Sequence, residues 1–140
     1  MREIKFRAFQ KGHKRMSRIT NVEFDRETGE IIAACFDNTS NGKHSIIPHF
    51  NWYRKNDEDW NLNNLEIMQY TGLKDKNGKE IYEGDIIQVL DKEDYPEPLI
   101  LIGKVDSDKW GTWVFGYGYL QDFEGMYEVI GNIHENPELL

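Results

Sequence analysis

The sequence predicts a mainly β fold with antiparallel strands, arranged as a sandwich or a barrel. Short apolar runs recur along the chain, some alternating with polar residues, and turn-forming residues separate one run from the next. We find no internal repeat and no low-complexity segment. A chain of 140 residues without a linker-like stretch has the usual size of one domain, so we expect a single domain over residues 1–140.

Hairpins account for the first part of the chain. Ile4, Phe6 and Ala8 alternate with Lys5 and Arg7, which is typical of a half-buried strand. The following elements are, in order, a turn at 11–14, a strand through 19–24, a turn at 26–29 and a strand at 31–36.

The middle of the chain is less regular. Residues 45–50 can form only an edge strand, because Pro48 has no N–H to donate to a ladder. Residues 56–61 indicate a short helical turn or loop, with Asn56 or Asp57 as its N-cap.

Residues 69–87 contain the clearest pattern, two apolar strands joined by a turn. Asn77-Gly78 supplies that turn, because both residues tolerate the positive φ of tight hairpins. Glu83-Gly84-Asp85 predicts a second tight turn, with Gly84 in a conformation ill-suited to a side chain. The expected task of Asp85 is to cap this turn by accepting backbone N–H bonds.

The C-terminal part continues the alternation of loops and strands. After an acidic loop at 91–98, strands are expected at 99–105, 112–119 and 127–133. Asn136 as N-cap and Pro137 at the first helical position then predict a final short helical turn.

Three segments carry a resemblance to a known family. They are Met1–Ala8, Tyr70–Asp85, and Val129–Ile133 followed by Glu135–Leu139. Together they resemble the YopX family of small phage and prophage proteins, whose biochemical role is unassigned. The resemblance implies an antiparallel pseudo-barrel built from hairpins and capped by a short helical segment, so the fold stays mainly β with an α+β margin.

The resemblance also implies a YopX-like domain in the cytoplasm of a bacterial host. Two departures stand out: Phe9-Gln10 occupies a place where family members often carry a Trp-Asp pair, and residues 35–65 match no part of the pattern. The motif residues to which we assign a structural role are Gly72, Asn77, Gly78, Gly84, Asp85 and Gly131.

Composition agrees with a cytoplasmic protein. The single cysteine, Cys35, excludes an internal disulfide, and its apolar surroundings favour a buried, inert thiol. The longest apolar runs are too short to span a bilayer, and the N-terminus lacks the apolar stretch of a signal peptide. We therefore expect no membrane contact.

Charge is distributed unevenly along the chain. Residues 1–18 contain seven Lys/Arg and one acid, a net charge of +6, whereas the whole chain carries −8. The acidic remainder repels a polyanion, so nucleic acid is not expected to be the main partner. The basic residues form a candidate patch that either pairs with acidic neighbours or touches a phosphate backbone: Arg2, Lys5, Arg7, Lys11, Lys14, Arg15 and Arg18.

Motifs for metal, nucleotide or catalytic chemistry fail on spacing. The segment 75–80 lacks the acids of a calcium loop, and no Lys-Ser/Thr pair follows the glycines at 111–118. The four histidines lie at no metal-ligand spacing. We therefore expect no catalytic residue, no metal, no cofactor and no enzymatic activity.

Trp52, Tyr53 and Trp60 stand among Asn and Asp residues outside any periodic pattern. Such aromatics are typical of protein interfaces, and packing in a small satellite core is the alternative. We therefore expect a protein-binding or assembly module, with an unidentified host or phage partner or with further copies of itself. Two alternatives are an accessory nucleic-acid-binding protein that uses the basic N-terminal hairpin, and a small enzyme with an unrecognised acidic site.

Overall fold

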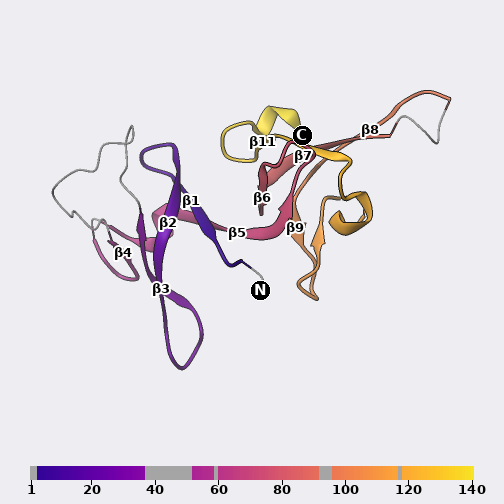
Figure 1. Cartoon of the computed structure of the whole chain (residues 1–140). Helices are drawn as coiled ribbons and strands as arrows, with labels where there is room; N and C mark the ends of the chain where they lie inside the picture. Colours follow the sequence, from indigo (N-terminus) through magenta and orange to yellow (C-terminus); the bar gives the residue numbers. More distant parts are fainter. Residues whose placement is uncertain (1–2, 37–51, 59, 92–95, 117) are drawn as a thin grey trace. The chain divides into compact units, whose positions relative to one another are not determined.

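The computed structural model describes residues 3–36, 52–58, 60–91, 96–116 and 118–140 (Figure 1). In these residues the chain forms strands and short 3-10 helices, and no α-helix. The strands are β1 (Phe6–Gln10), β2 (Arg15–Phe24), β3 (Ile31–Phe36), β4 (Trp52–Arg54), β5 (Leu65–Lys74), β6 (Glu80–Tyr82), β7 (Asp85–Asp91), β8 (Leu99–Lys104), β9 (Asp106–Ser107), β10 (Trp113–Val114) and β11 (Tyr127–Asn132). The helices are η1 (Leu62–Asn64), η2 (Leu120–Phe123) and η3 (Pro137–Leu139).

The chain divides into two compact units. Residues 5–67 form one, which we call the N-terminal unit, and residues 1–4 with 68–140 form the other, the C-terminal unit. Strand β5 begins in the first and ends in the second. The single domain expected over residues 1–140 stays a prediction, because two compact units of one chain can still unfold together.

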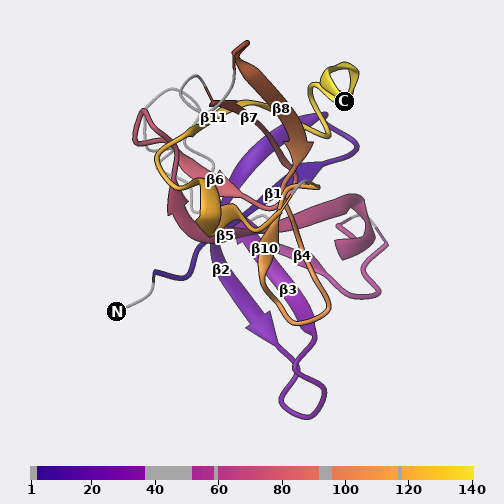
Figure 2. The ribbon, with the colours of Figure 1, turned by 90° about the vertical axis from the view of Figure 1, so that its right-hand side faces the viewer.

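The N-terminal unit is one antiparallel sheet. Its strands lie in the order β4-β3-β2-β1, and the start of β5 extends the sheet beyond β1. Strands β2 and β3 form a long hairpin (Figure 2), whose loop is closed by the carboxylate of Asp25 accepting the N–H groups of Glu27 and Thr28, each at 2.8 Å. The buried core of the unit consists of Ala8, Ile19, Ala34, Phe36, Tyr53 and Leu65.

The C-terminal unit combines a sheet with two hairpins. The sheet has the order β11-β7-β8, and β5 pairs with β6 and β9 with β10, all antiparallel. Asp85, Ile86 and Ile87 of β7 are all buried, so both faces of the strand are covered at its start, and burial alternates only from Ile87 onward. The buried core consists of Ile81, Ile87, Val89, Val105, Phe115, Leu120 and Tyr127.

The turn at Glu83-Gly84 connects several segments of the C-terminal unit. The Gly84 N–H donates to the Val105 carbonyl at 2.8 Å, and the Gly84 carbonyl accepts the Ile133 N–H at 2.9 Å. Asp85, which is only 1% exposed, accepts the Tyr82 N–H at 2.8 Å and so caps the turn as predicted. A φ of +80° confirms that Gly84 has a conformation ill-suited to a side chain.

Asp75 is a buried carboxylate that organises the turn between β5 and β6. Its Oδ1 accepts the N–H groups of Asn77 and Lys79 at 2.8 and 2.9 Å, and its Oδ2 accepts the Val129 N–H at 3.0 Å. Burial acts to raise the pKa of Asp75, but the three N–H donors together hold that pKa below its usual value. The turn is therefore fastened to β11 through one side chain.

The turn at Asn77-Gly78 forms as expected, but its backbone conformation differs from that of a tight two-residue turn. Only Gly78 has a positive φ, of +80°, whereas Asn77 does not. The Gly78 N–H donates to the Asp75 carbonyl and the Asp75 N–H to the Lys79 carbonyl, which gives a longer loop than the two-residue turn we expected. A loop of this kind needs one left-handed residue rather than two.

Two further motif glycines have identifiable structural tasks. Gly72 has a φ of +84° at the place where β5 shifts register against β6, between Tyr70 and Lys74. At Gly131, an added Cβ would lie 2.6 Å from the Asn136 Oδ1. Gly131 therefore permits the close approach of the segment that ends the chain.

The predicted mainly β, antiparallel fold with short helical segments is confirmed. The strands of the described ranges form three open sheets, so they do not close into a barrel. Strand β10 is shorter than the strand predicted at 112–119, because Gly116 with a φ of +92° ends the extended conformation. The edge strand expected around Pro48 lies outside the described residues.

Replacing Gly84 with valine should destabilise the protein by a few kcal/mol, because strain at a positive φ adds to crowding. A Cβ at Gly84 would lie 3.2 Å from the Met68 Sδ and 3.5 Å from the Ile133 Cγ1. Gly78→Val is the matched control, since Gly78 has the same φ of +80° and nothing within 4 Å of its Cβ position. We expect this control to lose about 1–2 kcal/mol of its free energy of unfolding, measured in urea. If Gly84→Val and Gly78→Val lose the same free energy of unfolding, the crowding around Gly84 is contradicted.

Replacing Asp75 with asparagine should cost about 1–3 kcal/mol at neutral pH, because an amide nitrogen would face backbone donors. In the wild type the folded pKa is lowered, so the carboxylate contributes stability above the usual value of 3.8 and loses it as the pH falls through the folded pKa. The melting temperature, measured from pH 7 to 2, should therefore fall less at low pH in the variant than in the wild type, because the variant has no carboxylate at position 75 to protonate.

Asp25→Asn is the control for Asp75→Asn, since Asp25 also accepts two backbone N–H bonds, but in an exposed turn. We expect Asp25→Asn to lower the free energy of unfolding at neutral pH by less than Asp75→Asn does. If the melting temperature of Asp75→Asn falls with decreasing pH as steeply as that of the wild type, the role given to Asp75 is refuted.

Candidate functional site, an aromatic pocket beside a basic hairpin

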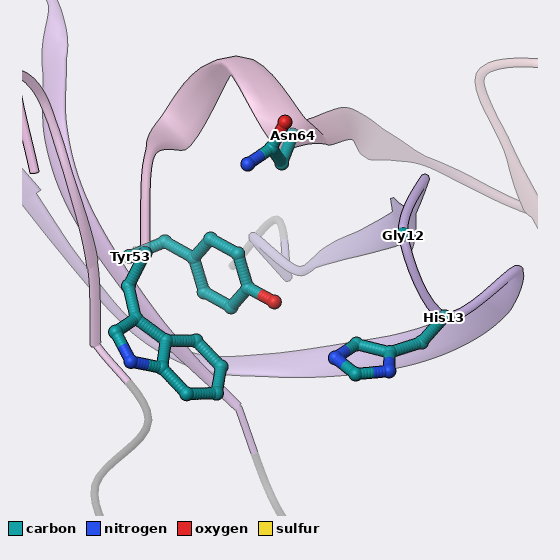
Figure 3. Close-up of a pocket in the computed structure, with 5 residues that line it drawn as sticks. Gly12, His13, Tyr53 and Asn64 are labelled. Atoms are coloured by element: carbon teal, nitrogen blue, oxygen red, sulfur yellow. The ribbon is translucent and has the colours of Figure 1, made fainter. Parts of the chain in front are cut away.

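A cavity of about 500 Å³ lies within the N-terminal unit. We call it the aromatic pocket, and its volume falls in the range of ligand-binding pockets. The imidazole of His13 and the ring of Tyr53 face the hollow from opposite sides (Figure 3). The β1–β2 turn, strand β4, the segment before η1 and η1 itself supply its lining residues, which are Gly12, His13, Tyr53, Trp60 and Asn64.

Ring contacts and a hydrogen bond hold the side chain of Tyr53 in place. It is 4% exposed, and its ring packs edge-on against Phe36 and against Trp60, each with 5.3 Å between ring centres. Its hydroxyl donates to the Gln10 Oε1 at 3.4 Å, and the Gln10 Nε2 donates to the Ser17 Oγ at 2.7 Å. Tyr53 is therefore a rigid wall of the pocket as well as a core residue.

Trp60 is held by a short polar turn. The Asp57 carboxylate accepts the Trp60 N–H at 2.8 Å, as expected of a capping residue, and the Asn61 side chain donates to the Asp57 carbonyl at 3.1 Å. The Arg54 N–H donates to the Trp60 carbonyl at 2.8 Å. The indole remains 39% exposed, so Trp60 is a wall of the pocket that solvent reaches.

Trp52, the third aromatic candidate, is not among the residues that line the pocket. Successive residues of a strand point to opposite faces, so Trp52 and Arg54 share the face of β4 that Tyr53 does not. The Arg54 guanidinium lies 5.4 Å from the centre of the Trp52 ring. The structure therefore brings together two of the three predicted interface residues.

Two cations are next to a pocket residue in the chain. Lys14 and Arg15 follow His13 directly, and both are exposed. Neither side chain makes a hydrogen bond or ion pair with any residue that the structure describes. Arg15 lies opposite Gln10 in the β1–β2 register, on the side to which the Tyr53 hydroxyl also turns. Burial raises the pKa of Tyr53, and the nearby Arg15 opposes this effect.

The remaining basic candidates are placed differently. Lys11 makes an ion pair with Glu66, with 2.8 Å between Nζ and Oε1. Arg2 lies outside the described residues. The other members of the predicted basic patch lie along β1 and β2 or just before them: Lys5, Arg7 and Arg18.

The lining of the pocket suits binding better than acid–base chemistry. Among the described residues that line it, none is a carboxylate or a thiol. Across the described parts of the chain, no group of three or more His, Cys, Asp or Glu side chains could hold a metal ion. Within those same ranges, no helix is long and apolar enough to cross a membrane.

Sequence reasoning missed the polar half of the pocket. His13 was noted only as a histidine without metal-ligand spacing, and Gln10, which accepts a hydrogen bond from the Tyr53 hydroxyl but does not line the pocket, only as a departure from the family pattern. Asn64 was not singled out at all. The contact that joins these segments runs from the Lys11 N–H to the Asn64 carbonyl at 2.9 Å, and no local pattern predicts such a distant pairing.

Comparison with known proteins gives a family and a solved structure. The YopX protein family matches residues 5–140, including the segment 35–65 that matched nothing by inspection. The crystal structure of protein EF1440 from Enterococcus faecalis is 31% identical in sequence, with a TM-score of 0.69, and the match covers 100% of this chain and 99% of that chain. No curated protein matches the chain.

Substitution of Tyr53 and of Trp60 should have different effects on the stability of the protein. Tyr53→Ala should lower the free energy of unfolding by about 3–5 kcal/mol, because it removes a buried ring from the core. Trp60→Ala should cost about 1 kcal/mol, since the indole is partly in solvent. Denaturant unfolding of both variants measures the difference. The reverse order would show that Trp60, rather than Tyr53, supports the unit.

Proposed function

This chain belongs to the YopX family, and we propose that it is a non-enzymatic module that binds a protein partner. The aromatic pocket takes an apolar or aromatic side chain from an acidic segment of that partner. The observation that carries the proposal is the position of Lys14 and Arg15, two cations without partners among the described residues, beside a pocket walled by Tyr53 and Trp60.

Each part of the pocket has a physical task in such binding. A rigid ring and a partly exposed indole offer apolar surface to an anchoring side chain, and aromatic anchors dominate interface energies. The exposed cations attract acidic residues that flank the anchor, and they add mainly to the association rate and to specificity. His13 and Asn64 offer polar groups at the edge of the pocket.

The nucleic-acid alternative is supported by one observation. An exposed Trp60 in a pocket whose lining residue His13 precedes two cations without side-chain partners among the described residues is an arrangement that could stack a base and hold a phosphate. The net charge of −8 opposes it, because a polyanion is repelled by the chain as a whole. We therefore rank a protein partner first.

Titration calorimetry with short peptides tests the proposal. Acetyl-Asp-Asp-Phe-Asp-Asp-amide should bind, whereas the same peptide with serine in place of phenylalanine, or with lysine in place of aspartate, should not. Trp60→Ala should weaken binding by at least about tenfold. Trp52→Ala is the matched control, since Trp52 does not line the pocket, and it should bind as the wild type does.

Two results would count against the protein-binding proposal. Equal binding of the serine and phenylalanine peptides would show that the pocket takes no anchor. Tighter binding of a ten-nucleotide oligo(dT), with an affinity that falls steeply as salt is raised, would favour the nucleic-acid alternative.

A further inference from the structure

Trp110 is the most exposed large apolar side chain of the described residues, at 79%. It lies in the loop between β9 and β10, in the C-terminal unit. A tryptophan at this exposure leaves a large apolar surface in water, and the same surface would stabilise a complex in which it is covered.

The loop that carries Trp110 is held in one shape. The Asp108 Oδ1 accepts the N–H groups of Trp110 and Thr112, both at 2.9 Å. The Asp108 N–H donates to the Thr112 carbonyl, and the Gly111 N–H, at a residue with a φ of +77°, donates to the Asp108 carbonyl. A side chain presented by a preorganised loop loses little conformational entropy on binding.

Charge distinguishes the two units. The N-terminal unit contains ten Lys/Arg and nine Asp/Glu, a net charge of +1, whereas the C-terminal unit contains seven Lys/Arg and sixteen Asp/Glu, a net charge of −9. The C-terminal unit of one molecule is thus attracted to the cations beside the aromatic pocket of another. Such complementarity steers encounters and favours one orientation.

The chemistry of the indole matches the pocket. Tyr53 and Trp60 offer ring edges and faces, and an indole packs well against both. The indole N–H is a donor only, and it needs an acceptor when it is buried. Asn64 lines the pocket, and its side-chain carbonyl can supply one. Lys109 lies over the Trp110 ring at 5.0 Å, so it covers only one face of the indole.

We propose, building on the proposed function, that the partner segment is the β9–β10 loop of a second copy of this chain, with Trp110 in the aromatic pocket of its neighbour. Each molecule then offers one loop and one pocket from different surfaces. The contact joins two different surfaces, so two copies can form it reciprocally as a pair, or several copies can form it in a ring or an open chain.

Complementation of two variants tests this inference by sedimentation velocity at low salt. The wild type should form a dimer or larger species as its concentration rises. Trp110→Ala keeps the pocket and loses the loop anchor, whereas Trp60→Ala keeps the anchor and loses a wall of the pocket. Each variant alone should associate at least about tenfold more weakly than the wild type.

An equimolar mixture of the two variants should form a dimer and nothing larger, because it restores a single loop–pocket contact. A mixture that stays monomeric, or a Trp110→Ala variant that associates like the wild type, would overturn the inference. Arg15→Glu provides a second pocket variant that leaves the aromatic packing in place: alone it should associate more weakly than the wild type, and mixed with Trp110→Ala it should also form a dimer.

The two proposals can fail separately. If the acidic phenylalanine peptide binds and the variant mixture stays monomeric, the pocket serves another partner and only the self-association is refuted. If the mixture forms a dimer that an excess of this peptide does not dissociate, the loop docks outside the pocket, which also refutes the inference.

Discussion

The N-terminal unit depends on the placement of Tyr53, because one side chain completes the core and also forms the pocket. Its ring meets Phe36 on the core side and Trp60 on the pocket side, and its hydroxyl is tied to Gln10. The pocket is therefore preorganised: a ligand need not order the ring that it meets. A mobile aromatic in the same position would have to lose its rotamer freedom on binding.

The C-terminal unit relies on a different device, side chains that capture backbone N–H groups. Asp75 binds three such groups and Asp108 two, and both are carboxylates in turns. Short strands bury little apolar surface, so these bonds fix loops that packing alone would leave loose. The same device that shapes the loop around Trp110 also fastens the β5–β6 turn to β11.

Local patterns predicted the hairpins well, because their signals lie within a few residues. The conformation of Gly84 and the capping by Asp85 follow from a tight turn before an apolar strand. The sequence does not distinguish a two-residue turn, which would need a positive φ at Asn77, from the longer loop that the structure has there. Tyr53 and Trp60 were singled out together with Trp52, but their meeting with His13 depends on a long-range contact between a hairpin turn and η1, which no periodicity encodes.

The central claim is that the aromatic pocket is a binding site, and nuclear magnetic resonance tests it most directly. In ¹⁵N-labelled protein each of the four tryptophans has its own indole N–H signal. On titration with the acidic phenylalanine peptide, the Trp60 indole signal and the backbone amides of Gly12, His13 and Asn64 should shift together, while Trp52 and Trp113 stay in place. Shifts that gather elsewhere, or no shift at all, would contradict the account.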